Sequence, residues 1–67
     1  MKISGRNKLP GRVTKIEREG FMAQVSLDCG GNEITAVVTG SALDDLGLRE
    51  GDQATALIKA TSVMLIK

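Results

Sequence analysis

Three short stretches of the chain combine hydroxyl groups, main-chain N–H groups and cations. They are residues 59–62 (Lys-Ala-Thr-Ser), residues 4–7 (Ser-Gly-Arg-Asn), and Thr39 with Ser41 at the expected start of a helix. A fully deprotonated tetrahedral oxyanion only accepts hydrogen bonds, so it needs a dry cluster of such donors with a fixed cation. At a helix start, free N–H groups and the helix dipole also favour negative charge. Each stretch is therefore a candidate oxyanion-binding segment.

Each stretch also has a purely structural interpretation. On spacing alone, residues 59–62 are typical of a polar turn between strands, and residues 4–7 of a frayed chain start. Thr39 and Ser41 are typical helix caps. Taken singly, each pattern favours the structural interpretation, and spacing alone does not show that the three stretches meet.

Composition argues against catalysis and against bound metal cations. The chain has no His, Tyr or Trp, and its single cysteine, Cys29, lies beside a glycine turn with no evident base to activate it. Asp44 and Asp45 are adjacent on the expected helix, so their side chains point in different directions. Zn²⁺ prefers Cys or His, and Ca²⁺ needs a loop dense in oxygen ligands. We expect no enzyme activity, no metal-ion site and no cofactor.

The distribution of charge bears on possible partners. The net charge is +1, with six bases and two acids in residues 1–19 but one base and six acids in residues 20–52. This balance gives no extended cationic surface for nucleic acid or membrane, and the single aromatic, Phe21, offers little for stacking bases. A lone cysteine fits a reducing compartment, and neither a leader nor a membrane-spanning apolar run is visible. We expect a cytoplasmic protein with no nucleic-acid or membrane partner.

The first half of the chain carries the spacing of strands. Its 67 residues are near the lower size limit for folding alone, so association between copies is expected. Apolar residues predict a bulged strand from Leu9 to Ile16, and a half-buried strand whose alternating apolar positions begin at Phe21. Glycines at 30 and 31 predict a tight hairpin turn into a third strand at 33–39.

The second half adds one helix and two further strands. Residues 39–48 predict a helix of about two turns that Thr39 or Ser41 caps, with Asp44 placed for a capping box, and that stops at Gly47. Alternation then predicts a strand at 53–60 and a closing strand at 63–66. These elements predict an all-β fold with one short helix, a small five-stranded barrel of the OB type.

Four motifs together resemble the molybdate-binding molbindin (Mop) family over essentially the whole chain. They are ISGRNKLPGRV near the start, VVT before the short helix, LGLREGD after it, and IKATSVM at the end. The family's first motif usually reads Ser-Ala-Arg-Asn, so Gly5 replaces the usual Ala, which would loosen that backbone without abolishing an amide contact. On this resemblance, residues 1–67 form a single molbindin domain.

The resemblance implies a barrel in which strands of two subunits complete each other, and a hexamer built as a trimer of dimers. It implies that molybdate, and also tungstate, binds between subunits for storage or homeostasis. Matched position by position, it assigns the oxyanion site to these residues: Ser4, Gly5, Arg6, Asn7, Thr39, Ser41, Lys59, Ala60, Thr61 and Ser62. In related domains the segment of Thr39 and Ser41 comes from the neighbouring subunit.

Donor chemistry gives each matched residue a role. Lys59 would contribute charge, while the remaining matched positions would give hydroxyl or N–H donors: hydroxyls from Ser4, Thr61 and Ser62, and N–H groups from Ala60 and Asn7. Arg6 either touches the ion or binds a neighbouring acid. The alternative is an OB-like interaction module that binds a protein or single-stranded nucleic acid, and a regulator that acts through a partner also stays open.

Overall fold

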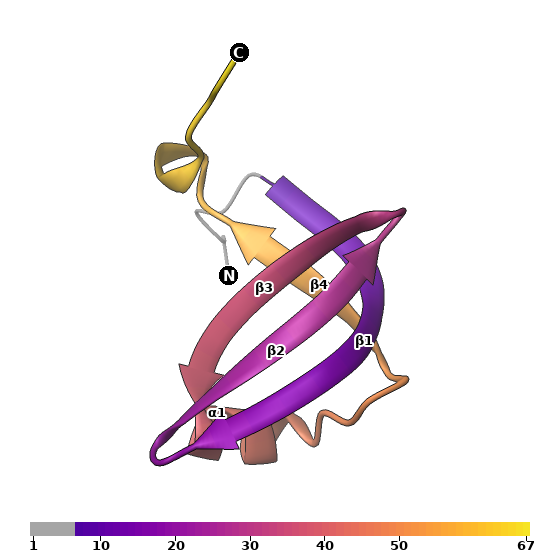
Figure 1. Ribbon diagram of the computed structural model, residues 1–67, viewed down its shortest axis with the longest axis vertical. Coiled ribbons are helices and arrows are strands. Elements are labelled where there is room, and N and C mark those ends of the chain that lie inside the picture. Colours follow the sequence, from indigo (N-terminus) through magenta and orange to yellow (C-terminus); the bar gives the residue numbers. More distant parts are fainter. Residues whose placement is uncertain (1–6) are drawn as a thin grey trace, which may run out of the picture.

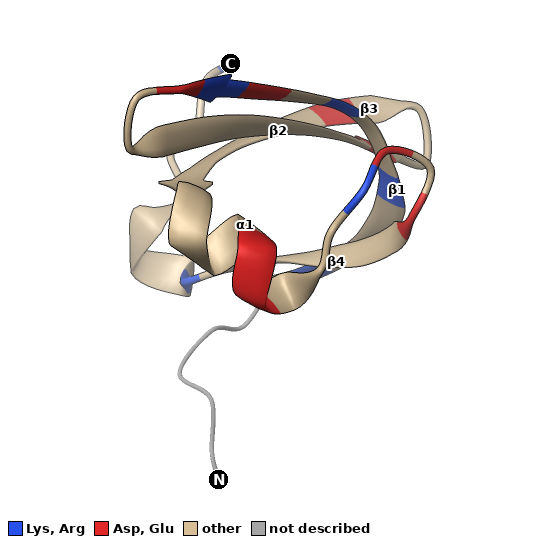
Figure 2. Ribbon diagram, turned by 90° about the horizontal axis from the view of Figure 1, so that it is seen from below, with Lys and Arg blue, Asp and Glu red and all other residues tan. Residues whose placement is uncertain are grey.

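The fold is a curled four-stranded antiparallel sheet with one short helix. The computed structural model describes residues 7–67, shown in Figure 1. Its elements are β1 (Asn7–Glu19), β2 (Met22–Cys29), β3 (Asn32–Thr39), α1 (Gly40–Leu46), β4 (Gln53–Ile58) and a 3₁₀ turn, η1 (Ala60–Ser62). The strand order is β3-β2-β1-β4. Seen from below, the sheet curls from β3 round to β4, and α1 lies at the open end of the curl (Figure 2).

β1 is the long strand that joins the two halves of the sheet. Residues 7–12 of β1 pair with β4, and residues 12–19 pair with β2. The register shifts between Val13 and Lys15, which confirms the predicted bulge. At this bend the chain needs a glycine, because a Cβ on Gly11 would lie 2.5 Å from Cys29 Sγ and 2.6 Å from the Asp28 carbonyl oxygen.

The β1–β2 turn corrects one prediction. Phe21 was expected at an alternating apolar position of the second strand, but it lies in the turn and its side chain is 93% exposed. The reason is Gly20, whose φ of 60° supplies the first residue of a tight hairpin turn, so the strand begins one residue later at Met22. The alternation itself holds, because Ala23, Val25 and Leu27 are buried.

The β2–β3 turn matches its prediction. Gly30 and Gly31 have φ of 63° and 90°, the conformation that a two-residue hairpin turn requires. The Gly31 N–H also donates to Asp28 Oδ1 at 2.9 Å. The two glycines and this local contact set the register in which Cys29 faces Asn32.

Helix α1 is capped by a side chain at its N-terminus and by main-chain hydrogen bonds at its C-terminus. Thr39 Oγ1 accepts from the Ala42 N–H at 3.1 Å, so Thr39 is the N-cap. Gly47, with φ of 62°, ends the helix, and Leu48 N–H donates to Leu43 O at 3.3 Å, which confirms the predicted Schellman stop. The capping box expected from Asp44 is wrong, because its carboxylate accepts from Arg18 Nη2 at 2.6 Å instead.

The core is small and aliphatic. Its buried members come from two strands, β1 and β2, and from the helix: Val13, Ala23, Val25, Leu27, Cys29 and Leu43. The Leu43 side chain of α1 is 1% exposed and packs against the inner face of the curled sheet. No helix among residues 7–67 is long and apolar enough to span a membrane.

The predicted fifth strand is not a strand in this chain. Residues 63–67, hereafter the C-terminal tail, pair with no strand within residues 7–67, and Figure 1 shows the tail projecting away from the sheet beyond η1. Met64 and Leu65 are 90% exposed and Ile66 fully so. The chain leaves the sheet at η1, directly after β4. Residues 7–67 of one copy therefore form a four-stranded sheet, and the predicted fifth strand is not confirmed within them.

The missing strand leaves an apolar groove between β3 and β4, hereafter the β3–β4 groove. Its volume is about 650 Å³. It is lined by residues 34–38 of β3, residues 53–58 of β4, and the side chains of Leu43 and Leu46 from α1. Leu46 and Leu57 are 70% and 48% exposed. Within the described chain these edges of the sheet stay open to a further strand.

Candidate oxyanion-binding site

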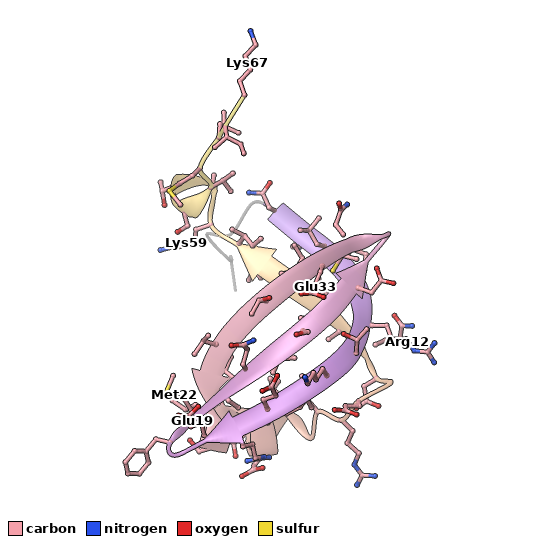
Figure 3. All side chains as sticks on the ribbon, viewed as in Figure 1. Arg12, Glu19, Met22, Glu33, Lys59 and Lys67 are labelled. Carbon is pink, nitrogen blue, oxygen red and sulfur yellow. The ribbon has the colours of Figure 1, made fainter. Side chains whose placement is uncertain are left out.

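The start of β1 lies beside the end of β4. Asn7 pairs with Ile58 in the antiparallel ladder, and its side-chain Nδ2 donates to the Ile58 carbonyl oxygen at 3.2 Å. Two segments 51 residues apart in sequence therefore meet at one end of the sheet. Figure 3 shows Lys59 at that end, directly after β4.

The turn after β4 presents free donors. It is closed by two main-chain hydrogen bonds, from Ser62 N to Lys59 O at 2.9 Å and from Val63 N to Ala60 O at 3.4 Å. The N–H groups of Ala60 and Thr61 precede these bonds, and neither has an acceptor within residues 7–67.

The side chains of the turn are equally available. Lys59, Thr61 and Ser62 are exposed and form no hydrogen bond or ion pair with the described part of the chain. The methyl of Ala60 leaves room for close approach to the main chain. One cation, two hydroxyls and two N–H groups over four residues are the donor set that a deprotonated oxyanion needs.

The first predicted segment is described only at its last residue. Ser4, Gly5 and Arg6 lie outside the described residues, so their place relative to η1 is not part of this structure. Asn7 is described and half-buried, and its side-chain amide is engaged with Ile58.

The third predicted segment lies at the other end of the molecule. Figure 1 shows α1 and η1 at opposite ends of the sheet, so Thr39 and Ser41 do not join Lys59 within one copy. Their hydroxyls lie 3.3 Å apart and share a hydrogen bond, while Thr39 Oγ1 also caps the helix. The first turn of α1 carries no acidic residue, and Asp44 beyond it is paired with Arg18.

The described residues show no arrangement for a metal cation. No group of three or more His, Cys, Asp or Glu side chains among residues 7–67 is placed to hold one. Cys29 is buried, and its Sγ lies 3.6 Å from the Leu9 carbonyl oxygen, where it packs as a small strand residue.

Sequence reasoning predicted the apolar run at 63–66 as a closing strand but missed the β3–β4 groove that is open in one copy. The available signal was the run Val63, Met64, Leu65 and Ile66 after a polar turn, which predicts a strand but not the copy in which that strand pairs.

Known proteins are similar to this chain in both sequence and fold. The TOBE domain model matches residues 3–65. The chain belongs to the TOBE domain family. Molybdenum-pterin-binding protein 1 of Clostridium pasteurianum is 40% identical to it over 67 residues, which cover 98% of each chain. The predicted kinship with the molbindin (Mop) family is thereby confirmed.

Solved structures agree with the fold of this TOBE domain. A molybdate-binding protein from Sporomusa ovata matches with a TM-score of 0.95 and 45% identity, covering all of both chains. The cytoplasmic molybdate-binding protein ModG, with molybdate bound, matches with a TM-score of 0.84 and 46% identity over 90% of this chain and 43% of that one. The mostly β architecture with one short helix is therefore the architecture of molybdate-binding proteins.

Proposed function

We propose that this TOBE domain binds molybdate, and the similarly sized tungstate, as an intact oxyanion, and that it stores or buffers the ion in the cytoplasm. The observation that carries the proposal is the pairing of Asn7 with Ile58, which sets the start of β1 beside the free donors of η1. The relatives named for molybdenum or molybdate binding support the choice of ion. No catalytic step and no cofactor are part of this function.

The site is completed by the residues that precede Asn7. Ser4 is three residues before Asn7, so chain length alone keeps its Cα within about 11 Å of the Asn7 Cα. We assign its hydroxyl to the ion that Lys59 attracts, and we assign Arg6 either to the ion or to a nearby acid. The Gly5 N–H adds a main-chain donor.

We further propose that the site lies at a boundary between copies. The tail exposes four apolar side chains in a row, and the β3–β4 groove offers two unpaired strand edges with apolar walls. Because η1 directs the tail away from its own groove, the occupant we assign to the groove is the tail of a second copy, as a fifth strand. Dimers formed in this way assemble into a hexamer, in which Thr39 and Ser41 of a neighbouring copy add hydroxyl donors.

The donor set predicts which ions are rejected. Phosphate carries a proton near neutral pH, and a pocket made only of donors leaves that proton unpaired, at a cost of about 1 to 3 kcal/mol. Sulfate has the same charge as molybdate and no proton, so only its smaller size disfavours it. We expect phosphate to be rejected more strongly than sulfate.

Isothermal titration calorimetry tests this function. Molybdate is expected to give a saturable heat of binding and phosphate none at equal ionic strength. Binding of phosphate alone, or of neither ion, would contradict the proposal, and the second result would favour the interaction-module interpretation.

A further inference from the structure

The second half of β1, residues 15–19, has a strand edge without a neighbouring strand, hereafter the β1 edge. On one side this half pairs with β2 as far as Glu19, whereas the pairing of β1 with β4 ends at Arg12, opposite Gln53. The strand order β3-β2-β1-β4 places no other strand of residues 7–67 beside it. Such an edge offers main-chain N–H and C=O groups to a strand of another molecule.

The side chain of Glu50 occupies the β1 edge. Its Oε2 accepts from the Ile16 N–H at 3.1 Å, although the two residues are 34 positions apart in sequence. The partner of this N–H is therefore a carboxylate instead of the carbonyl group of a neighbouring strand. A hydrogen bond to an ionised acceptor is roughly twice as strong as one between neutral groups. A strand that pairs here has to displace the carboxylate and bring its own carbonyl oxygens beside that charge.

The loop from Arg49 to Asp52 holds Glu50 in this position. Arg49 N donates to Asp52 Oδ2 at 2.9 Å, and Asp52 N donates to Arg49 O at 3.1 Å, so the loop closes on itself. Two main-chain bonds then join the loop to the bulge of β1, from Gly51 N to Val13 O at 2.8 Å and from Val13 N to Asp52 O at 2.9 Å. Glu50 is exposed, but the loop that carries it is fixed to the strand that it contacts.

The strand edges of the sheet also differ in charge. Residues 15–19 read Lys-Ile-Glu-Arg-Glu, so four of the five are charged, and a bulge precedes them. In contrast, β4 contains no charged residue, and β3 contains only Glu33. Charged side chains and bulges are features with which natural proteins keep a strand edge from pairing. The edges of β3 and β4 are therefore suited to pairing, whereas the β1 edge is not.

We propose that Glu50 blocks the β1 edge and so prevents two copies of the chain from joining edge to edge through it. This inference goes beyond the proposed function, because it does not involve the anion. The strand that is excluded is the same edge of a second copy, related by a two-fold axis.

The sequence of the β1 edge explains why a second copy is the strand to exclude. An antiparallel pair centred on Glu17 places Lys15 of each copy opposite Glu19 of the other, and such opposite charges attract across strands. It also places the Ile16 N–H against the Arg18 carbonyl oxygen of the second copy. This N–H is the donor that Glu50 already holds. The two Glu17 carboxylates at the centre repel each other and add to the block.

The variants Glu50→Ala and Glu50→Gln, in buffer without molybdate, test the proposal. Both remove one negative charge, but the Gln side chain keeps a carbonyl oxygen for the Ile16 N–H. Amide hydrogen exchange followed by nuclear magnetic resonance at low protein concentration is the first measurement. The Ile16 amide is expected to exchange about tenfold faster in Glu50→Ala than in Glu50→Gln. Equal exchange rates at Ile16 would overturn the proposal.

Sedimentation velocity from micromolar to millimolar protein is the second measurement. Glu50→Ala is expected to form species of about twice the mass of the largest wild-type species, because each edge joins two copies. Glu50→Gln is expected to sediment as the wild type does. If Glu50→Ala exchanges faster at Ile16 but never exceeds the wild-type assembly, the edge is unable to pair and the proposal is overturned.

Two further variants distinguish blocking from a loss of stability. Thr39→Ala removes the N-cap of α1 and leaves the β1 edge covered, so it lowers stability without freeing the edge. The same larger species in Thr39→Ala would show that association follows lost stability, and would overturn the proposal. If circular dichroism shows that Glu50→Ala does not fold, Glu50→Asp decides, because it keeps the charge on a side chain that is one methylene shorter. Glu50→Asp is expected to form the larger species, and wild-type sedimentation would overturn the proposal.

Discussion

Lys59 is the single charged residue in the described half of the candidate site, which consists of Asn7 and residues 59–62. It makes no ion pair with the described chain, so its charge is available to an anion. Lys59→Ala is expected to weaken molybdate binding roughly tenfold to a hundredfold, because a hydrogen bond to a charged group is lost. Calorimetry measures this loss, and the melting temperature without ligand should not change.

The control for charge alone is Lys15→Ala. Lys15 lies on the far half of β1 and pairs with Glu17 at 3.1 Å in an exposed contact, which contributes little to stability. The variant Lys15→Ala changes the net charge by the same amount as Lys59→Ala. If both variants weakened molybdate binding equally, Lys59 would act only through the overall field of the protein and not as a contact.

Packing requires a glycine at position 11, although the strand pattern of the sequence does not show this requirement. A Cβ at this residue would lie 2.5 Å from Cys29 Sγ and 2.6 Å from a main-chain oxygen, and the main chain cannot rotate away. Gly11→Ala is expected to lower the free energy of unfolding by about 2 kcal/mol, as overpacked positions do. Urea denaturation at fixed protein concentration measures it.

Gly40→Ala is the matched control for Gly11→Ala. Its Cβ would meet Arg18 Nη1 at 3.4 Å and the Phe21 carbonyl oxygen at 3.6 Å, which are ordinary or nearly ordinary contacts, and Gly40 has a helical conformation that Ala adopts. We expect a change within about 0.5 kcal/mol. Equal destabilisation by both substitutions would mean that the close approach at Gly11 is relieved by movement of the strands.

At the scale of elements, substitutions at the start of α1 distinguish helix capping from anion binding. Thr39→Ala removes the acceptor for the Ala42 N–H and is expected to cost about 1 kcal/mol of stability without any ligand, whereas Thr39→Ser keeps the cap. Ser41 is not the N-cap, and its hydrogen bond to Thr39 is exposed, so Ser41→Ala is expected to change the melting temperature little. Because we assign its hydroxyl to the site of a neighbouring copy, the variant is expected to weaken molybdate binding. Thermal melts with and without molybdate distinguish the two roles, and a large loss of ligand-free stability in Ser41→Ala would contradict this division.

Local signals predicted most elements, because their causes are local. The glycine pair at 30 and 31, the bulge in β1 and the stop at Gly47 depend on a few neighbouring residues, and all three are confirmed. Phe21 was misplaced because its apolar character continued the alternation, whereas the positive φ of Gly20 decided where the turn lies. The capping box failed because Arg18, 26 residues away in sequence, offers Asp44 a charged partner.

The candidate site was predictable as chemistry but not as geometry. Donor types and their order along residues 59–62 are visible in the sequence, whereas their meeting with the start of β1 depends on the β1–β4 ladder between residues 51 positions apart. The open groove could not be predicted from the pattern of residues, because the apolar run at 63–66 has the same alternation whether it pairs with its own sheet or with another copy; only the family resemblance implied strands shared between subunits.

At the scale of the whole molecule, the single chain buries little apolar surface and exposes much. Six residues form the core, while Val37, Leu46, Leu57 and the tail remain open to solvent. Such a core gives a domain of this size only marginal stability, so most of the stability is expected from association. Within residues 7–67, the tail and the groove together offer apolar surface for this association.

Thermal unfolding as a function of protein concentration tests this dependence. For a dimer of this length, the melting temperature is expected to rise by about 5 °C for each tenfold increase in concentration, because unfolding then includes dissociation. Leu65→Glu is expected to melt at a lower temperature that does not vary with concentration. A wild-type melting temperature that is constant from micromolar to millimolar protein would show that one chain is stable alone, and the groove would then have to close on its own tail.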